Sequence, residues 1–181
     1  DNFLLSFPID LADVIKSRLQ IFVIMSDVII DDISASYSQI GLIDEKHSNA
    51  YSINDRLSLI IDNTIDKFNS KIEGNTEWTL ACIKSSLPEV FLATSEKFVP
   101  QMLNLDINEI GVNFSKGCYP GQEVVARLHY LGSAKRRLFS FKSDHEMQVG
   151  DSLYCVNSKT ALARGDRYKG SGIVVSKVKY N

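Results

Sequence analysis

The sequence predicts an α+β protein with one large domain or two small ones. Its 181 residues are enough for a real hydrophobic core. The first two thirds of the chain interleave helical stripes of apolar residues with short strand-like runs. After Gly132 the pattern changes to short alternating runs separated by Gly, Asp and Asn, which is typical of an antiparallel sheet. A composition of 44% hydrophobic and 23% charged residues is that of an ordinary globular protein.

The N-terminal part, residues 1–75, is expected to follow the split β-α-β plan of ferredoxin-like folds. It begins with a strand over 3–9 and a helix over 10–25, for which Asp10 is the N-cap. The apolar stripe of this helix consists of Leu11, Val14, Ile15, Leu19, Phe22 and Val23. The remaining elements are strands over 27–34 and 35–43, a polar loop over 44–56, a strand over 57–62 and a helix over 63–72.

The middle part, residues 76–133, is expected to hold two helices joined by an irregular segment. The first helix ends at the residue before Pro88. Its inner residues are Trp78, Cys82 and either Leu80 or Ile83. Residues 96–114 carry apolar residues without a clean period, which indicates ordered but irregular structure. The second helix covers 122–131 after Gly121, with Val124, Val125 and Leu128 on its apolar face.

The C-terminal part, residues 134–181, is expected to be an antiparallel β-barrel or sandwich. Strand-like runs lie at 135–144, 151–157 and 170–180. A domain boundary is expected near residues 132–135, where the sequence pattern changes to short alternating runs. The last part is small for an independent barrel, which predicts that the barrel is incomplete.

Composition and charge exclude several classes of protein. The formal net charge of −2 gives no whole-protein attraction to nucleic acid or to an anionic membrane. No apolar run approaches the roughly 18 residues of a membrane span, and the N-terminus has no signal-peptide pattern. The lack of an initiator methionine predicts that the chain begins within a longer protein. Three scattered cysteines (Cys82, Cys118 and Cys155) indicate a reducing compartment, and no metal site is expected.

Packing alone does not explain SKGCYPGQEVVAR, residues 115–127. The helix after Gly121 places Cys118 just before a helix N-terminus, where exposed N–H groups and the macrodipole favour an anion. Lys116 adds a positive charge two residues away. Both features favour a reactive thiolate. The alternative is an inert buried cysteine in a Gly/Pro turn.

Other chemistry has weaker support in the residues. A cysteine hydrolase needs a base near the sulfur, and His129 is expected on the order of 12 Å away, at the far end of the helix. Glu123 and Arg127 have the spacing of an ordinary helix ion pair. Trp78, the only tryptophan, is either a core anchor or a stacking platform for a planar heterocycle. The basic stretch 126–142 is either a solvated linker face or a contact for an anionic ligand tail or a nucleic-acid backbone.

The segment KGCYPGQE (116–123) resembles the K-G-C-Y-x-G-Q-E signature of the YgfZ family, folate-binding proteins related to the aminomethyltransferase (T-protein) of the glycine cleavage system. KFVPQMLNLD (97–106) is similar to the family's F-x-P-Q-x-x-N-L segment, and GQEVVARLHYLGSAKRRL (121–138) continues its G-Q-E-x-V-A-R…G…K-R pattern. EWTLACIKSSLPEV (77–90) occupies the place of the family's W-x-x-x-x-I-x-x-G-I-P segment. GSGIVVS (170–176) resembles a strand of its C-terminal barrel.

The resemblance implies an aminomethyltransferase-like fold, lacking its N-terminal part, around a channel for tetrahydrofolate or a derivative. It implies that Trp78 binds the folate and that Cys118 and Lys116 are the functional pair of the signature. The supporting motif residues are Gly117, Tyr119, Gly121, Gln122, Glu123, Arg127, Gln101 and Asn104. This sequence departs from the family pattern at Ser86 and Leu87, which stand where the family has the Gly and Ile of G-I-P, and the stretch 42–57 is shorter.

The function implied by the resemblance is that of a folate-binding accessory protein. It would support the maturation or repair of iron–sulfur enzymes, and thereby tRNA thiolation, in the bacterial cytoplasm or in the mitochondrial matrix of a eukaryote. Iron–sulfur proteins such as tRNA-thiolating enzymes are its expected functional partners, and no membrane partner is expected. The resemblance leaves open whether the chain is itself an enzyme and whether it binds nucleic acid directly.

Two alternatives to the accessory role are kept. One is a folate-dependent aminomethyl or one-carbon transferase, which the signature disfavours because classical aminomethyltransferases lack the cysteine. The other is a thiol redox enzyme, which would require Cys82 or Cys155 to fold close to Cys118 as a resolving cysteine.

Overall fold

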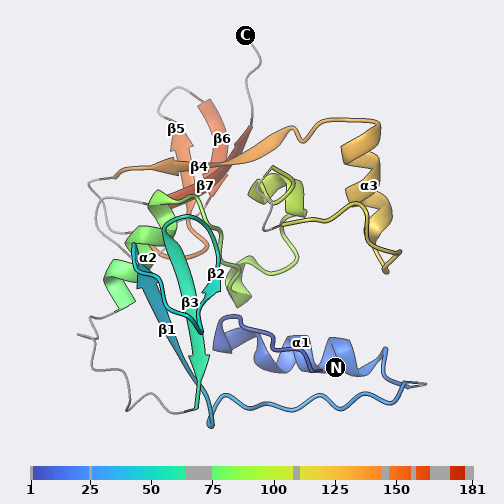
Figure 1. The fold of residues 1–181 in the computed structure, drawn as a ribbon. Coiled ribbons are helices and arrows are strands. Elements are labelled where there is room, and N and C mark those ends of the chain that lie inside the picture. The colour runs from blue at the N-terminus through green and yellow to red at the C-terminus, as the bar shows by residue number, and fades with distance from the viewer. Residues whose placement is uncertain are drawn as a thin grey trace. The chain divides into compact units, whose positions relative to one another are not determined.

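The structure is a computed structural model in which residues 2–24, 26–63, 75–107, 111–143, 147–155, 158–163 and 172–177 are described. The chain divides into two compact units (Figure 1). Unit 1 contains Asp1–Gly74 and Glu89–Leu92, and unit 2 contains Asn75–Pro88 and Ala93–Asn181. Helices and antiparallel sheets occur together, which confirms the α+β class. The domain boundaries expected from the sequence stay predictions.

Unit 1 is built on a three-stranded antiparallel sheet in the order β1-β3-β2. The strands are β1 (Ser38–Ile43), β2 (Tyr51–Ser52) and β3 (Leu57–Asp62). In the register of the central strand, Ile60 pairs with Ile40 and Leu59 with both Gly41 and Tyr51. Leu57 and Ile60 are each only 1% exposed, so the central strand supplies the core of this unit.

The helical start of unit 1 is shorter than expected. A 3-10 turn, η1 (Ile9–Leu11), leads into α1 (Ala12–Gln20), so the helix ends at Gln20 rather than at residue 25. The predicted N-cap role of Asp10 was wrong, because its carboxylate accepts a hydrogen bond from the backbone N–H of Leu92 at 2.9 Å. This bond ties the segment 89–92 to unit 1. Of the predicted apolar stripe, only Leu11 is buried.

Two strands predicted for unit 1 do not form. Residues 3–8 and 27–33 have no regular secondary structure, and β2 lies within the predicted loop 44–56. Phe3 and Ile29 are largely exposed, so these apolar runs lack the packed face that makes a strand stable. The described part of unit 1 therefore differs from the expected ferredoxin-like order. The helix predicted over 63–72 lies outside the described residues from position 64 onward.

An ion pair closes the connection between β1 and β3. The Asp44 N–H donates to the Arg56 carbonyl at 2.7 Å, and the Arg56 guanidinium meets the Asp44 carboxylate at 2.6 and 2.8 Å. The hydrogen bond from Arg56 holds the pKa of Asp44 below its ordinary value. Both side chains are half exposed, so the pair fixes the local geometry more than it adds stability.

In its described residues, unit 2 combines two α-helices, short 3-10 turns and a four-stranded antiparallel sheet in the order β4-β7-β6-β5. Its elements are α2 (Asn75–Lys84), the end of η3 (Leu92–Thr94), η4 (Pro100–Leu103), α3 (Gln122–Tyr130), β4 (Arg136–Phe141), β5 (Ser152–Cys155), β6 (Ser158–Ala163) and β7 (Gly172–Lys177). The three predicted strands are confirmed, and β6 was missed. As described, this sheet is open rather than a closed barrel.

The core of unit 2 is assembled from all of these parts. Its buried apolar residues are Ile83, Leu103, Val125, Ala134, Leu138 and Met147. The predicted irregular segment 96–114 is confirmed, since it contains the turn η4 and no longer element in its described part. One buried member of this segment, Gln101, is polar and only 1% exposed. Among the helices of the described ranges, none has the length and apolar content to cross a membrane.

Helix α2 ends in a Schellman motif centred on Ser86. The Leu87 N–H donates to the Cys82 carbonyl at 2.9 Å, and the Ser86 N–H donates to the Ile83 carbonyl at 3.0 Å. This geometry requires the left-handed backbone conformation at Ser86, whose φ is 53°. Serine therefore occupies a position that suits glycine, which is where the related family pattern has the glycine of G-I-P.

Replacing Ser86 with glycine is expected to stabilise unit 2 by about 0.5 to 1 kcal/mol, since the left-handed strain exceeds the entropic cost of glycine. The midpoint of urea unfolding, followed by the fluorescence of the single tryptophan in α2, measures the change. Ser85→Gly is the matched control, because Ser85 has no positive φ and should lose stability instead. A gain for both variants, or for neither, would contradict the helix-end explanation.

Candidate functional site

The segment that precedes α3, residues 113–121, is called the Cys118 loop. Its first half is an Asx turn around Asn113. The Asn113 side-chain oxygen Oδ1 accepts hydrogen bonds from the backbone N–H groups of Ser115 at 2.8 Å and of Lys116 at 3.2 Å. The sequence N-F-S-K-G thus folds back on a single amide side chain. Asn113 was not among the residues that sequence reasoning assigned to the site.

The second half of the Cys118 loop is a type II turn over Tyr119-Pro120-Gly121-Gln122. The Gln122 N–H donates to the Tyr119 carbonyl at 3.2 Å, and Gly121 has φ 88° and ψ −2°. The Gln122 side-chain Oε1 also accepts from the Tyr119 N–H at 3.1 Å, so both backbone groups of Tyr119 are held by Gln122. A Cβ at Gly121 would meet nothing within 4 Å, so this glycine is needed for its backbone angles rather than for space.

Cys118 lies between these two turns as an exposed free thiol. Helix α3 begins at Gln122, which confirms the predicted helix after Gly121 and places Cys118 four residues before it. Lys116 is also exposed, and Gly117 has neither a positive φ nor any atom within 4 Å of a built Cβ. The thiol is therefore presented to solvent, and the alternative of a buried, inert cysteine does not describe this structure.

Helix α3 carries the predicted ion pair on its outer side. The guanidinium of Arg127 meets the carboxylate of Glu123 at 2.5 Å, with side chains 68% and 80% exposed. Val125 is buried as predicted, but Val124 is exposed, so the apolar face is narrower than the sequence indicated. The pair sits on the solvent side of the helix and does not fix the Cys118 loop.

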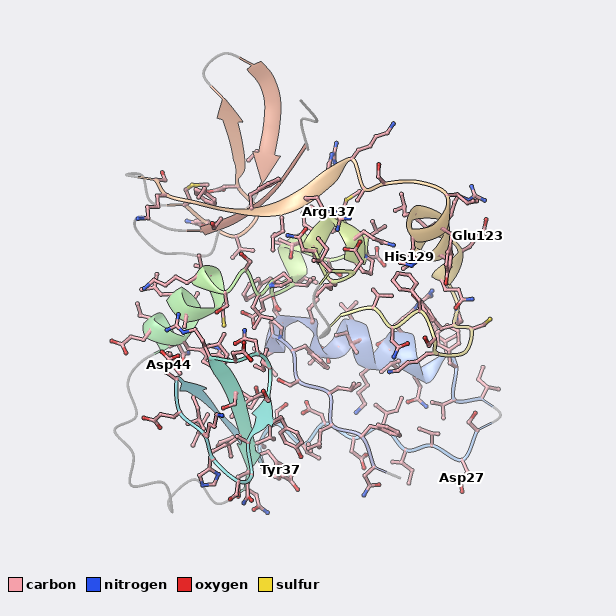
Figure 2. All side chains as sticks on the ribbon, turned by 45° about the horizontal axis from the view of Figure 1, so that its top comes forward. Asp27, Tyr37, Asp44, Glu123, His129 and Arg137 are labelled. Atoms are coloured by element: carbon pink, nitrogen blue, oxygen red, sulfur yellow. The ribbon has the colours of Figure 1, made fainter. Side chains whose placement is uncertain are left out.

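Three rings join the start of the Cys118 loop to the far end of α3. The rings of Phe114 and His129 stack with centroids 3.6 Å apart and an interplanar angle of 16°. Tyr130 meets both rings edge-on, at 4.7 Å from His129 and 6.2 Å from Phe114. His129 is thus engaged with aromatic rings at the end of α3 (Figure 2).

Residues 100–106, called the η4 segment, connect α3 to β4. The Gln101 side-chain N–H donates to the carbonyl of Val125, in the middle of α3, at 2.6 Å. The Asn104 side-chain N–H donates to the carbonyl of Leu138, in β4, at 3.0 Å. Asn104 also ends η4 in the left-handed conformation, with φ 60°, which asparagine tolerates well. Gln101 and Asn104, both predicted motif residues, therefore hold the η4 segment to α3 and β4.

A part-buried ion pair that involves Arg137 (labelled in Figure 2) strengthens the same connection. The Arg137 guanidinium, on β4, meets the Asp106 carboxylate at 2.5 and 3.0 Å. The same guanidinium donates to the Gln101 carbonyl at 2.8 Å. The side chains are only 23% exposed for Arg137 and 12% for Asp106. Sequence reasoning missed this pair, since 31 residues separate its members and no local pattern joins them.

Two buried oxygen atoms at this connection have no hydrogen-bond partner among the described residues. They are the side-chain oxygens Oε1 of Gln101 and Oδ1 of Asn104. In each side-chain amide, the N–H group therefore donates to a backbone carbonyl, and the oxygen is an acceptor that these residues leave unused. A buried acceptor without a partner lowers the stability of the fold by its desolvation free energy. The two oxygens therefore mark a polar site in the interior of unit 2.

Trp78 lies on α2 and is half buried. Both figures show α2 and α3 apart within unit 2, with the η4 segment between them in Figure 1. The structure therefore brings Cys118 and Lys116 together in one loop, but it does not bring Trp78 beside them. The same separation applies to Cys82, a second cysteine, which lies on α2, and this counts against its acting as a resolving cysteine for Cys118.

Comparison with known proteins identifies relatives of this chain. A "tRNA-modifying protein YgfZ" from Photorhabdus laumondii is 30% identical over 139 residues, which cover 72% of this chain and 40% of that protein. Another, from Colwellia psychrerythraea, is 51% identical over 70 residues, covering 38% of this chain and 21% of that protein. Over these stretches the chain is similar to proteins of the YgfZ family.

A third relative, an uncharacterized protein of Haemophilus influenzae, is 42% identical over 78 residues, covering 42% of this chain and 28% of that protein. No protein-family model matches the sequence. The chain spans less than half the length of these YgfZ relatives. The family signature, residues 116–123, is the part of the chain that forms the type II turn and the start of α3.

Proposed function

We propose that this chain acts in tRNA modification as a YgfZ-type accessory protein, through the thiol of Cys118. The observation that carries the proposal is an exposed cysteine on a loop that two side-chain amides hold in place. The names of the relatives support the link to tRNA modification. An exposed thiol on the outside of a unit suits contact with a second protein, such as an iron–sulfur enzyme, better than chemistry inside a closed cavity.

The position of Cys118 also favours chemistry over packing. Its side chain contributes nothing to the core, because residues 115–121 are all exposed. It precedes the N-terminus of α3, where the helix dipole favours negative charge, and Lys116 lies in the same loop. In this role the thiolate of Cys118 would act as a ligand to an iron atom of the partner enzyme's cluster, a step that releases only the thiol proton to solvent, while the loop holds the cysteine in place.

Folate binding forms the second part of the proposal, together with the aminomethyltransferase-like fold. The half-buried indole of Trp78 fits a stacking role, since part of a large aromatic surface stays open. A bound tetrahydrofolate would supply or accept one-carbon units, and this chain would contribute the stacking surface. Since the Cys118 loop lies apart from α2, we assign the thiol and the folate to separate tasks.

A reduced folate is expected to quench the fluorescence of Trp78, which is the only tryptophan of the chain. Trp78→Ala should weaken the affinity about 10- to 100-fold, judging by the contribution of base–aromatic stacking elsewhere. Isothermal titration calorimetry with 5-formyltetrahydrofolate measures the affinity of both proteins. Trp78→Phe keeps a smaller stacking surface and should lose less. Equal affinities for all three proteins, or none for the unmodified chain, would remove the folate part of the proposal.

A further inference from the structure

We propose that Asn113 and Gln122 are positioning residues that hold the backbone on both sides of Cys118. Asn113 binds two N–H groups on the N-terminal side of the cysteine, and Gln122 binds the N–H and carbonyl groups of Tyr119 on its C-terminal side. Cys118 thus lies between two stretches of backbone, residues 115–116 and residue 119, that these hydrogen bonds hold in place. The inference rests on the proposed function only for the use made of the thiol.

The two amides work on a segment that needs such support. From Ser115 to Gly121 every residue is exposed, so the hydrophobic effect does not hold this stretch in one conformation. The segment has glycine at two positions, 117 and 121, which adds conformational freedom to the unfolded and locally opened states. Hydrogen bonds from side chains to the backbone are therefore the main forces that select one loop shape.

Both ends of the Cys118 loop are connected to helix α3 of unit 2. At one end, Phe114 follows Asn113 directly and stacks on His129 of α3. At the other end, Gln122 is the first residue of α3. Helix α3 is in turn held by the hydrogen bond from Gln101 to the Val125 carbonyl and by the burial of Val125. The position of the thiol relative to α3 is thus set by Asn113 and Gln122.

The geometry predicts which substitutions keep the positioning. In these hydrogen bonds the side-chain oxygens of Asn113 and Gln122 are the acceptors for the loop N–H groups. Asp and Glu retain such an oxygen at the same place, and Glu is favourable in the first turn of a helix. Asn113→Asp and Gln122→Glu should therefore preserve the loop, whereas Asn113→Ala and Gln122→Met should release it.

The first test is amide hydrogen exchange, measured by NMR on the full chain. In Asn113→Ala the exchange rates of the Ser115 and Lys116 amides are expected to rise up to about tenfold, which corresponds to the loss of one hydrogen bond. In Gln122→Met the same rise is expected at Tyr119. The conservative Asp and Glu variants should keep the slow rates. Ser115→Ala is the matched control, because it removes a side chain of the loop and leaves the side-chain hydrogen bonds of Asn113 and Gln122 in place. Unchanged rates in Asn113→Ala and Gln122→Met would overturn the proposal.

The second test asks whether the position of the thiol matters. The variants are compared for their ability to restore thiolated tRNA in bacteria that lack their own YgfZ. Loss of rescue in Asn113→Ala with recovery in Asn113→Asp supports positioning. Full rescue by an Asn113→Ala protein whose loop amides exchange faster overturns it. If Cys118→Ala also restores thiolated tRNA fully, the proposed function fails. The exchange data then still decide whether Asn113 and Gln122 hold the loop.

Discussion

Arg137→Met is expected to lower the free energy of unfolding of unit 2 by about 3 kcal/mol, which is the low end of the cost of removing one partner from a buried ion pair, because this pair is part-buried. The change leaves the Asp106 carboxylate, only 12% exposed, without its cation. It also removes the donor that the Gln101 carbonyl uses. Since a domain is stable by only about 5 to 15 kcal/mol, this loss is a large part of the total. Urea unfolding at low temperature, followed by Trp78 fluorescence, measures it.

The chain contains a matched control for this prediction. The Arg127–Glu123 pair has the same 2.5 Å separation, but its side chains are 68% and 80% exposed. Arg127→Met is therefore expected to cost no more than about 1 kcal/mol, because water screens an exposed pair. Equal losses for Arg127→Met and Arg137→Met would contradict the importance of burial at the η4 segment.

A double variant separates the charge effect from a general disturbance of packing. Removing both charges in Arg137→Met with Asp106→Leu leaves no unpaired carboxylate. The double variant should therefore be more stable than Arg137→Met alone. If it is less stable by the sum of the two single losses, the pair is not coupled, and the destabilisation comes from lost packing.

Sequence patterns located the elements that carry their own local signal. The helix after Gly121, the strands at 136–141 and 152–155 and the irregular segment around η4 were all predicted, because turn residues and apolar periods mark them. The signature around Cys118 was also visible, since glycine, proline and a thiol in one turn are unusual. These features depend on residues within a few positions of one another.

The errors and omissions have a common physical cause. The runs at 3–9 and 27–34 have strand-like composition, but a strand needs a partner, and composition does not supply one. The Asp106–Arg137 pair and the hydrogen bond from the Leu92 N–H to the Asp10 carboxylate join residues far apart in sequence. Such contacts depend on the tertiary fold. Asn113 had a local signal, because asparagine often binds the backbone two residues ahead.

The largest functional effect is expected for Cys118→Ala, which should abolish the restoration of thiolated tRNA in bacteria lacking YgfZ. The chain is tested both alone and as a chimera in which it replaces the matching segment of the Photorhabdus laumondii relative. The stability of unit 2 should stay within about 0.5 kcal/mol, since an exposed side chain outside the core is removed. Thiolated nucleosides are quantified by mass spectrometry of total tRNA.

Cys82→Ala lets this experiment discriminate between the two roles, because Cys82 is a second cysteine of the described residues and lies half buried on α2. If Cys118 acts alone toward a partner, Cys82→Ala rescues and Cys118→Ala does not. If the protein were a thiol redox enzyme with Cys82 as the resolving thiol, both variants would fail while remaining folded. Full rescue by Cys118→Ala, or no rescue by the unmodified chain in either form, would refute the proposed function. The separation of α2 from the Cys118 loop makes the first outcome the expected one.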